Sequence, residues 1–259
     1  MRRPDVAISA PAMPTALLAD IHANQEALSA CLEHARRQGV DTYAFLGDLV
    51  GYGADPGPVV DLVIASVQRG AVAVLGNHDQ AVAQGPSQTM NADARKVIAW
   101  TREHLTPAQL AFLGSLPLTE EREGGLHVHA NAWDPGAWEY ITSAFDAGRS
   151  LRATQCQQTF CGHVHQPVLY HRTADGRVYE FEPVPGTAIR LGGRRRWLAI
   201  PGSVGQPRDG NPAACYAVFD AATATLTYFR VPYDAEGAAR KVRDAGLPQR
   251  LGMRLEAGS

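Results

Sequence analysis

The sequence has few of the features that mark disulfide-rich, membrane-spanning or strongly charged proteins. Its four cysteines, at positions 31, 156, 161 and 215, are scattered over 259 residues without a Cys-x-x-Cys pair. So few cysteines exclude a disulfide scaffold and fit a reducing cytoplasm. No uncharged apolar run reaches the roughly 20 residues that a membrane-spanning helix needs, so we expect no membrane partner.

The charges are almost balanced. The chain has 24 Lys plus Arg against 26 Asp plus Glu, which gives a formal net charge of -2. Overall electrostatics therefore gives no argument for binding to nucleic acid or to an anionic membrane. With 45% hydrophobic and 19% charged residues, the chain has enough apolar material for a packed core and too little charge for disorder.

A chain of this length fits one large domain. The first residues contain Met1-Arg2-Arg3 and then a mostly apolar stretch, which has the outline of a secretory leader. Asp5, Pro11 and Pro14 interrupt that stretch and argue against a leader. We expect residues 1–12 to form a loose extension and residues 13–259 to form the single domain.

Strand and helix patterns alternate from residue 15. Apolar runs at 15–19, 43–46 and 71–75 predict three buried strands. A helical spacing of apolar residues from about Asn24 to Gly39, and another after Asp55-Pro56, predict the intervening helices. Two consecutive strand-helix-strand units indicate a parallel sheet, in which ligands bind beyond the carboxyl ends of the strands.

The rest of the chain predicts more helices and a second sheet. Residues 80–116 are mostly helical in pattern, and Thr106-Pro107 is typical of a helix start. Short apolar runs between about 126 and 231 predict further strands, and a final helix is expected near Asp234 or Ala235. The expected fold is α/β, with two sheets packed face to face and enclosed by helices.

Histidine is the most informative residue type. Six of the nine histidines lie at predicted strand ends beside Asp, Asn or Gly. The segments, in chain order, are Asp20-Ile-His22, Gly47-Asp48, Gly76-Asn77-His78-Asp79, His127-Val-His129 and Gly162-His163-Val-His165. Since each follows an apolar run, we expect these side chains to meet at one sheet edge. Their oxygen and imidazole donors suit borderline divalent ions such as Mn²⁺, Fe²⁺ or Zn²⁺.

The order and spacing of these segments resemble the calcineurin-like metallophosphoesterase superfamily over nearly the whole chain from residue 15. The wording Gly47-Asp-Leu-Val-Gly-Tyr-Gly53, the segment Pro201-Gly-Ser-Val-Gly-Gln-Pro-Arg208 and the ending Ala245-Gly-Leu-Pro248 are similar to its compact prokaryotic phosphoesterase branch. The resemblance implies a four-layer αββα sandwich of two mixed sheets flanked by helices. It also implies a metal-dependent phosphoester hydrolase acting on a small phosphoester.

The resemblance also implies roles for individual residues. One metal ion would be held by Asp20, His22 and His165, the other by Asn77, His129 and His163, and Asp48 would bridge both. Mn²⁺ is the expected ion at both sites, with Fe, Zn, Ni and Mg as alternatives. A hydroxide shared by the two ions would attack phosphorus in line, Asp48 and Asn77 would take part in catalysis and substrate binding, and His78 would protonate the leaving group.

Several positions depart from the family pattern. Ala23 and Ala130 stand where glycines are common after Asp-x-His and after the lone histidine. Gly51 and Tyr52 stand where the protein serine/threonine phosphatases of the superfamily have an Asp-Arg pair, which argues against a protein phosphatase. Without that local guanidinium the site is expected to favour phosphodiesters or activated esters, and Arg208 is the candidate to supply a phosphate-binding charge.

Other residues have a structural and a functional interpretation. His127 is predicted to pack beside the site rather than to bind metal. Asp79 either orients His78 or caps the helix that follows, with equal weight. The aromatic residues Trp133, Trp138 and Tyr140 could wall a binding pocket, but packing within the domain is favoured.

The sequence thus predicts a phosphodiesterase with a dinuclear metal centre. A phosphomonoesterase or a dinucleoside-polyphosphate hydrolase is the enzymatic alternative. A non-catalytic scaffold on the same fold is the alternative from another class, and the intact set of metal-binding side chains argues against it.

Overall fold

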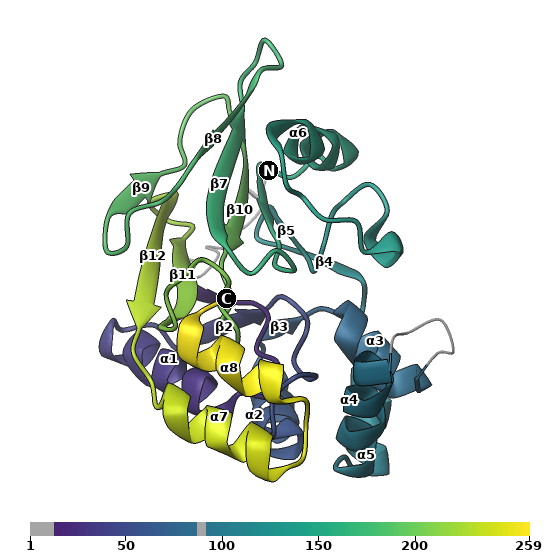
Figure 1. Cartoon of the computed structure of the whole chain (residues 1–259). Coiled ribbons are helices and arrows are strands. Elements are labelled where there is room, and N and C mark those ends of the chain that lie inside the picture. The colour runs from purple at the N-terminus through teal and green to yellow at the C-terminus, as the bar shows by residue number, and fades with distance from the viewer. Residues whose placement is uncertain (1–12, 87–91) are drawn as a thin grey trace, which may run out of the picture.

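The structure is a computed structural model that describes residues 13–86 and 92–259, and the extension expected over residues 1–12 lies outside them. The first elements alternate as the sequence predicts (Figure 1). They are β1 (Thr15–Leu18), α1 (Gln25–Arg37), β2 (Thr42–Phe45), α2 (Pro56–Gln68) and β3 (Val72–Ala73). The Asn24 side chain caps α1 by accepting a hydrogen bond from the Ala27 N–H at 3.1 Å.

The first sheet has six strands in the order β3-β2-β1-β11-β12-β9. Its later strands are β9 (Ala188–Arg190), β11 (Ala214–Asp220) and β12 (Thr225–Val231). The pairs β1–β2 and β2–β3 are parallel, whereas β1 pairs with β11 in antiparallel fashion. The carboxyl ends of β1 and β2 therefore meet at one edge, as the two strand-helix-strand units predict.

The second sheet also has six strands, in the order β4-β5-β6-β10-β7-β8. They are β4 (Thr119–Arg122), β5 (Gly125–Val128), β6 (Gln158–Phe160), β7 (Pro167–Arg172), β8 (Val178–Phe181) and β10 (Arg196–Pro201). The neighbours β5, β6 and β10 are parallel, and the remaining pairs are antiparallel. The segments that follow β5 and β6 carry His129 and His163.

The remaining helices include two that the sequence analysis did not expect. They are α3 (Asn77–Gln84), α4 (Ala92–Glu103), α5 (Pro107–Ser115), the short η1 (Pro135–Ala137), α6 (Ala144–Ala153), α7 (Ala235–Asp244) and α8 (Gln249–Ala257). Helix α6 is unexpected, and the expectation that the helix near Asp234 is the last one is wrong because α8 follows it after Pro248. Within 13–86 and 92–259, no helix combines the length and apolar character needed to span a bilayer.

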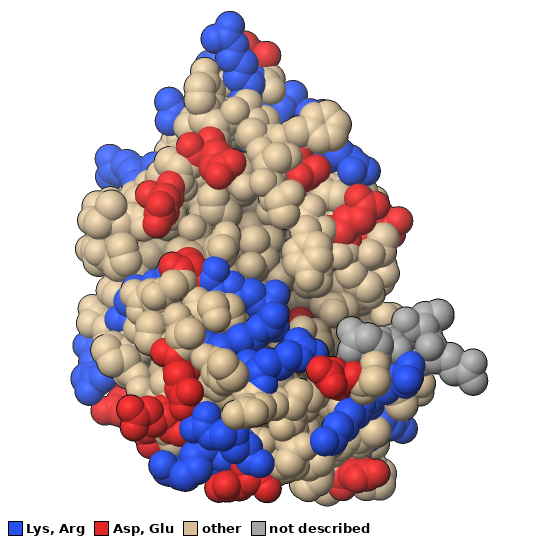
Figure 2. All heavy atoms as spheres, in the orientation of Figure 1, with Lys and Arg blue, Asp and Glu red and all other residues tan. Residues whose placement is uncertain are grey.

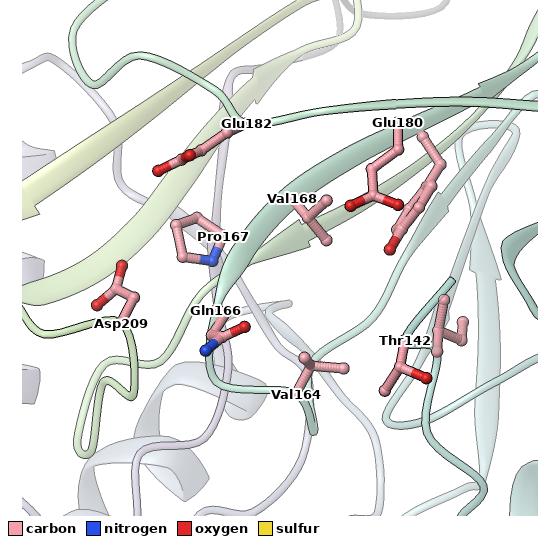
Figure 3. Close-up of a pocket in the computed structure, with 10 residues that line it drawn as sticks. Thr142, Val164, Gln166, Pro167, Val168, Glu180, Glu182 and Asp209 are labelled. Atoms are coloured by element: carbon pink, nitrogen blue, oxygen red, sulfur yellow. The ribbon is translucent and has the colours of Figure 1, made fainter. Parts of the chain in front are cut away.

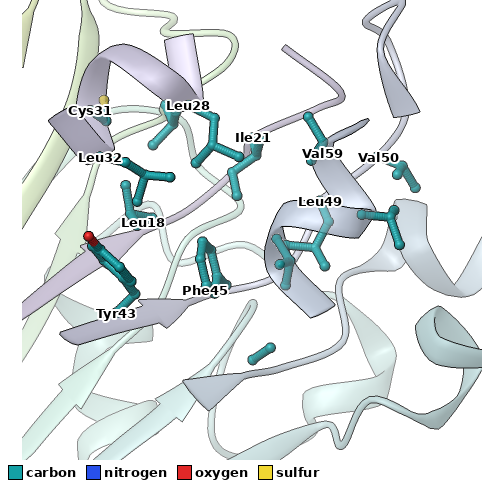
Figure 4. Packing of buried hydrophobic residues seen from close by; sticks show 14 of the residues in the cluster. Leu18, Ile21, Leu28, Cys31, Leu32, Tyr43, Phe45, Leu49, Val50 and Val59 are labelled. Atoms are coloured by element: carbon teal, nitrogen blue, oxygen red, sulfur yellow. The ribbon is translucent and has the colours of Figure 1, made fainter. Parts of the chain in front are cut away.

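The layers follow from the alternation of side chains along the strands. Leu17 of β1 packs between the sheets with Phe160 and Trp197 of the second sheet. Its neighbour Leu18 points to the opposite face and packs with α1 and α2, where Phe45 also lies (Figure 4). Helix α6 covers the outer face of the second sheet. The fold is the predicted α/β arrangement of two mixed sheets between helical layers.

Candidate metal centre

The residues that follow the strands have a strained backbone. Among the described residues, ten non-glycine positions have positive φ angles, and seven of them lie in the predicted site or beside it. These are Asp20 (53°), His22 (51°), Ala23 (52°), Asp48 (52°), Tyr52 (62°), His163 (71°) and His165 (64°). Such conformations cost about 1–3 kcal/mol each and concentrate at functional sites. The turn after Asp-x-His thus accepts a methyl group in the left-handed conformation.

Four histidines are oriented by backbone carbonyl oxygens. The contacts are His22 Nδ1 with Val50 O (3.3 Å), His129 Nδ1 with Leu46 O (2.8 Å), His163 Nε2 with Trp138 O (2.9 Å) and His165 Nδ1 with Gln206 O (2.6 Å). A carbonyl oxygen only accepts, so the ring nitrogen facing it carries the proton. The other nitrogen of each ring is left to act as a ligand, which is the usual arrangement of metal-binding histidines.

The other ring nitrogens face each other in two pairs. His22 Nε2 lies 3.1 Å from His165 Nε2, and His129 Nε2 lies 3.1 Å from His163 Nδ1. Two nitrogen lone pairs at this distance repel each other unless a proton or a metal cation lies between or beside them. Each pair is therefore arranged as two ligands that approach the same cation.

Asp48 lies between the two pairs. Its Oδ2 atom is 3.7 Å from His22 Nε2 and 3.4 Å from His129 Nε2, while its Oδ1 accepts a hydrogen bond from the His78 N–H at 2.8 Å. The carboxylate is buried. One oxygen of Asp48 can therefore face both pairs, which is the position that a bridging ligand requires.

Asp20 and Asn77 complete the two ends of the cluster. Both carboxylate oxygens of Asp20 accept from the His163 N–H at 3.0 Å, and Oδ1 lies 3.6 Å from His165 Nε2. Asn77 Oδ1 lies 3.1 Å from His129 Nε2. The structure thus brings all seven predicted ligands together.

The cluster also includes a residue that was assigned a different role. Among the described residues, three groups of three side chains have ligand atoms, one from each side chain, that lie within 4.8 Å of one another. The groups are Asp20–His22–His165, His22–Asp48–His78 and Asp48–His129–His163. His78, which the sequence analysis predicts to be the leaving-group acid, thus lies as near to His22 and Asp48 as the predicted ligands of the other two groups lie to one another.

Burial and mutual charge shift the pKa values of the cluster. Burial lowers the pKa of His22 and His165 well below the usual value and that of His163 to about 4. Burial also opposes protonation of His129, but the Asp48 carboxylate outweighs it and raises the His129 pKa to about 9. Burial, followed by repulsion from Asp48, raises the pKa of Asp20 to about 7. Two buried carboxylates beside the neutral imidazoles of His22, His163 and His165 suit cations of the Mn²⁺, Fe²⁺ or Zn²⁺ type, which would displace the proton of His129.

Glycines allow the close approach of two of these side chains. Gly51 has a φ of +90°, and a Cβ atom there would lie 2.6 Å from His78 Nδ1. A Cβ on Gly162 would lie 2.8 Å from Asp20 Oδ2. His78 Nδ1 is buried and has no hydrogen-bond partner within the described part of the chain. Gly51 therefore leaves the space in which His78 is held beside Asp48.

Three aromatic residues contact the cluster in ways that the sequence did not predict. The Tyr52 ring centroid lies 4.5 Å from that of His22 and 4.4 Å from that of His78. Tyr140 stacks on His163 at 3.9 Å, and the Trp138 carbonyl orients the same histidine. The sequence analysis favours packing for Trp138 and Tyr140 because aromatic residues in loops more often pack on their own domain. Nothing in the sequence indicates that this segment folds back onto the site.

Other residues follow their structural interpretation. His127 lies outside the cluster, with Nδ1 3.1 Å from the Glu120 carbonyl oxygen, and packs against Phe160. Asp79 caps α3, since its Oδ2 accepts from the Gly76 N–H at 3.0 Å. Trp133 packs within the domain, as predicted, below the Arg149 guanidinium at 4.2 Å.

A cavity of about 430 Å³ lies beside the segment that carries His163 and His165 (Figure 3). Val164, between His163 and His165, lies on its wall, together with Thr142 and Gln166. Glu180, Glu182 and Asp209 also line it. Arg208, which precedes Asp209, donates its backbone N–H to the His165 carbonyl oxygen at 3.2 Å. A hydrogen bond thus joins the backbone of the predicted phosphate-binding arginine to the backbone of a predicted metal ligand.

Comparisons with known proteins identify relatives of this chain. Residues 13–224 match the calcineurin-like phosphoesterase superfamily domain. An uncharacterized protein of Methanocaldococcus jannaschii is 35% identical over 253 residues, which cover 94% of this chain and 97% of that protein. The crystal structure of a metallophosphoesterase from Sphaerobacter thermophilus is 36% identical, with a TM-score of 0.86 over 95% of this chain and 99% of that one. A hypothetical protein from Pyrococcus horikoshii OT3, 20% identical, shares the fold, with a TM-score of 0.76 over 96% of this chain and 99% of that one.

Proposed function

The chain belongs to the calcineurin-like phosphoesterase superfamily, and from that membership we propose that it is a two-metal phosphodiesterase. At the level of the family, the membership supports a metal-dependent phosphoester hydrolase. The main support for a two-metal mechanism is that a pair of imidazole nitrogens faces each other on each side of Asp48. The two nitrogens of each pair are 3.1 Å apart. Two cation sites that share one carboxylate are the arrangement that two-metal hydrolysis uses.

The proposed ligand sets follow the two histidine pairs. Asp20, His22 and His165 hold one ion, Asn77, His129 and His163 hold the other, and Asp48 bridges them. Mn²⁺ is the proposed ion, with Fe, Zn, Ni and Mg as alternatives that the nitrogen and oxygen donors also accept. Two ions at this site would polarise the phosphoryl oxygens and supply a hydroxide nucleophile at neutral pH.

His78 is the proposed acid that protonates the leaving group. It follows Asn77 directly, and its backbone N–H is fixed on Asp48 Oδ1 at 2.8 Å. Burial lowers its pKa, which favours the neutral ring before substrate binds. A bound phosphate anion beside the ring favours the protonated form, so the acid is formed where it is needed.

Phosphodiesters are the proposed substrates because the site offers limited positive charge to the phosphoryl group itself. Gly51 and Tyr52 supply no guanidinium, and Arg208 is the nearest candidate, with Asn77 as a neutral contact. A monoester dianion requires more positive charge than a diester monoanion. Phosphomonoesters and dinucleoside polyphosphates are the competing substrates.

The four cysteines support a cytoplasmic location. All four are buried and unpaired in the structure. Unpaired thiols are typical of a reducing compartment.

The direct test compares two aryl phosphates. Chelated protein is supplied with Mn²⁺, and turnover of bis(4-nitrophenyl) phosphate is measured against that of 4-nitrophenyl phosphate. We expect activity only with metal and a larger kcat/KM for the diester. A larger kcat/KM for the monoester would favour a phosphomonoesterase, and inactivity on both esters and on a nucleotide panel would favour a scaffold.

The role of His78 is tested with esters of different leaving groups. His78→Ala should keep two metal ions and lose roughly a hundredfold or more in rate on alkyl esters, because an alkoxide leaves poorly without a proton. The loss should shrink for nitrophenyl esters. His127→Ala, a buried histidine outside the cluster, is the matched control. Loss of metal from His78→Ala would make it a ligand, and a uniform rate loss would make it a phosphate-positioning residue.

A further inference from the structure

Arg208 is held at the edge of the metal centre. Besides its backbone contact to His165, its Nη2 donates to Gln206 Oε1 at 2.9 Å, and its guanidinium lies 5.9 Å from the Tyr52 ring centroid. The Arg208 Nε and Gln206 Nε2 atoms are buried, and neither has a hydrogen-bond partner in the part of the chain that the structure describes. Two buried donors at the same place indicate that a hydrogen-bond acceptor binds here.

Helix α8 carries a second arginine, Arg254, and packs beside the loops that hold Tyr52 and Arg208. Tyr52 packs against the apolar cluster that contains Leu251 and Leu255, so α8 is docked beside the loop that carries Tyr52. The end of α8 also binds the segment that follows Arg208, because the Gly210 N–H donates to the Gly258 carbonyl oxygen at 2.8 Å. Arg254 lies in the last turn of α8, next to this contact. Figure 2 shows Lys and Arg side chains gathered at the edge of a hollow, in the region where Figure 1 shows α8.

Arg208 and Arg254 have no carboxylate partner. In residues 13–86 and 92–259, neither side chain forms an ion pair, whereas the neighbouring Arg250 pairs with Asp93 at 2.9 Å. Two guanidiniums on adjoining segments, neither with a counter-charge, repel each other, and an anion bound between them removes the repulsion. Their planar forks match the oxygens of a phosphate group.

Two phenols complete the rim of this surface. Tyr52 contacts the rings of His22 and His78, and Tyr140 stacks on His163. The Tyr140 side chain is 50% exposed. The Arg208 guanidinium lies 5.9 Å from the Tyr52 ring centroid. Each phenol offers a neutral hydroxyl donor to a ligand bound at this rim.

From this geometry we infer that Arg254, Tyr52 and Tyr140 bind a second phosphate group of the substrate, next to the scissile one, together with Arg208, which is also the candidate cation for the scissile phosphoryl group. The inference rests on the proposed function and narrows it: the preferred substrate is a phosphodiester in which one alcohol itself carries a phosphate. Arg254 is then a specificity-determining residue outside the metal centre.

The acidic cavity of Figure 3 suggests the opposite charge, a cationic substituent, but its carboxylates already have partners. Asp209 forms an ion pair with Arg230, and Glu182 also acts on the Arg230 charge. Glu180 interacts with the Tyr170 hydroxyl. The unpaired charges beside the centre are therefore the two guanidiniums, and they favour an anionic substituent.

The test uses three 4-nitrophenyl phosphodiesters that differ only in the second alcohol, which is ethanol, 2-phosphoethanol or choline. With Mn²⁺ we expect kcat/KM for the phosphoethyl diester to exceed that for the ethyl diester about tenfold or more, as a charge-assisted contact allows. Arg254→Gln should reduce this ratio about tenfold. Arg254→Lys, which keeps the charge without the fork, should retain part of it. Arg250→Gln is the matched control, because Arg250 already has a carboxylate partner, and it should leave the ratio unchanged.

The outcomes separate this inference from the proposed function. If no diester is hydrolysed, the phosphodiesterase proposal fails and the inference fails with it. If the ethyl diester is hydrolysed but the phosphoethyl diester is not preferred, or the choline diester is preferred, the inference alone is wrong. Equal losses of Arg254→Gln on the ethyl and phosphoethyl diesters would also overturn it, because they would indicate a structural role for Arg254.

Discussion

Metal binding to this protein should depend steeply on pH, because cations must displace protons from the cluster. The structure raises the pKa of His129 to about 9, since the Asp48 carboxylate outweighs the effect of burial. A ligand nitrogen must lose its proton before it binds metal. Between pH 7 and 9, the Mn²⁺ affinity of the chelated protein should therefore rise about tenfold per pH unit.

The size of this pH effect on metal affinity follows from the difference between the pKa of His129 and the ordinary histidine pKa of 6.5. The difference, about 2.5 pH units, corresponds to about 3.4 kcal/mol at 1.36 kcal/mol per unit. At pH 6.5, competition from the proton should thus weaken binding about 300-fold relative to binding above pH 9. The pKa of Asp20, raised to about 7, adds a second displaced proton below pH 7 and makes the dependence steeper there.

Calorimetry measures these protons directly. Titration of Mn²⁺ into chelated protein at pH 7.5, in two buffers with different ionisation enthalpies, should show about one proton released per chain. His127→Gln is the control, because His127 is buried outside the cluster and should leave this number unchanged. An affinity that is flat between pH 7 and 9, with no proton released, would refute the assignment of the displaced proton to His129.

Four further predictions follow from the site and the fold. Asp48→Asn should lower metal content at both sites together, because a neutral amide bridges two cations poorly, and metal analysis showing two ions with near-normal turnover would rule out the bridge. Gly51→Ala should lower the free energy of unfolding by about 1–3 kcal/mol, since it combines a left-handed φ with a contact of 2.6 Å to His78. The variant should keep both ions and lose most rate in the hydrolysis of alkyl esters. Unchanged kinetics would show that His78 needs no such space. Arg208→Ala should weaken monoester hydrolysis more than diester hydrolysis, and equal losses would remove Arg208 from the phosphoryl group. Burial lowers the pKa of His127 to about 4. As the pH falls below about 6.5, His127 therefore takes up a proton in the unfolded chain but stays neutral in the folded one. Denaturant titrations should show that the free energy of unfolding falls by about 3 kcal/mol from pH 7 to 4, relative to His127→Gln.

The sequence predicted that these side chains lie together because most of the signal is local. The segments that carry the proposed ligands follow apolar strands, and parallel strands end at a common edge, so residues at corresponding positions meet. Asp20 and Asp48, which follow β1 and β2, are examples. The sequence pattern does not determine the protonation states of the histidines or the distances between their rings. Both depend on the carbonyl oxygens that face each ring. Those oxygens belong to residues such as Leu46 and Gln206, whose side chains carry no recognisable signature.

The rim of the site could not be predicted in the same way. Tyr140 reaches His163 through a segment without regular periodicity, and Arg254 belongs to a helix that the sequence analysis did not expect. Helix α8 is short, and only Leu251 and Leu255 give it large buried apolar residues. Helix α6 was missed for a similar reason, since Leu151 is its one large buried residue. Such helices form through contacts made in the tertiary structure rather than through their own pattern.

Hydrogen bonds join the left-handed turns of the cluster, although these turns are far apart in the sequence. The backbone N–H of His163 is bound by the carboxylate of Asp20, 143 residues earlier, and the two residues follow strands of different sheets. No nascent segment therefore contains a whole cation site, and metal can be captured only after both sheets have formed and docked. Acquisition of the ions should be a late event in folding, and free metal in the cell should stabilise the docked sheets by mass action without speeding the formation of either sheet.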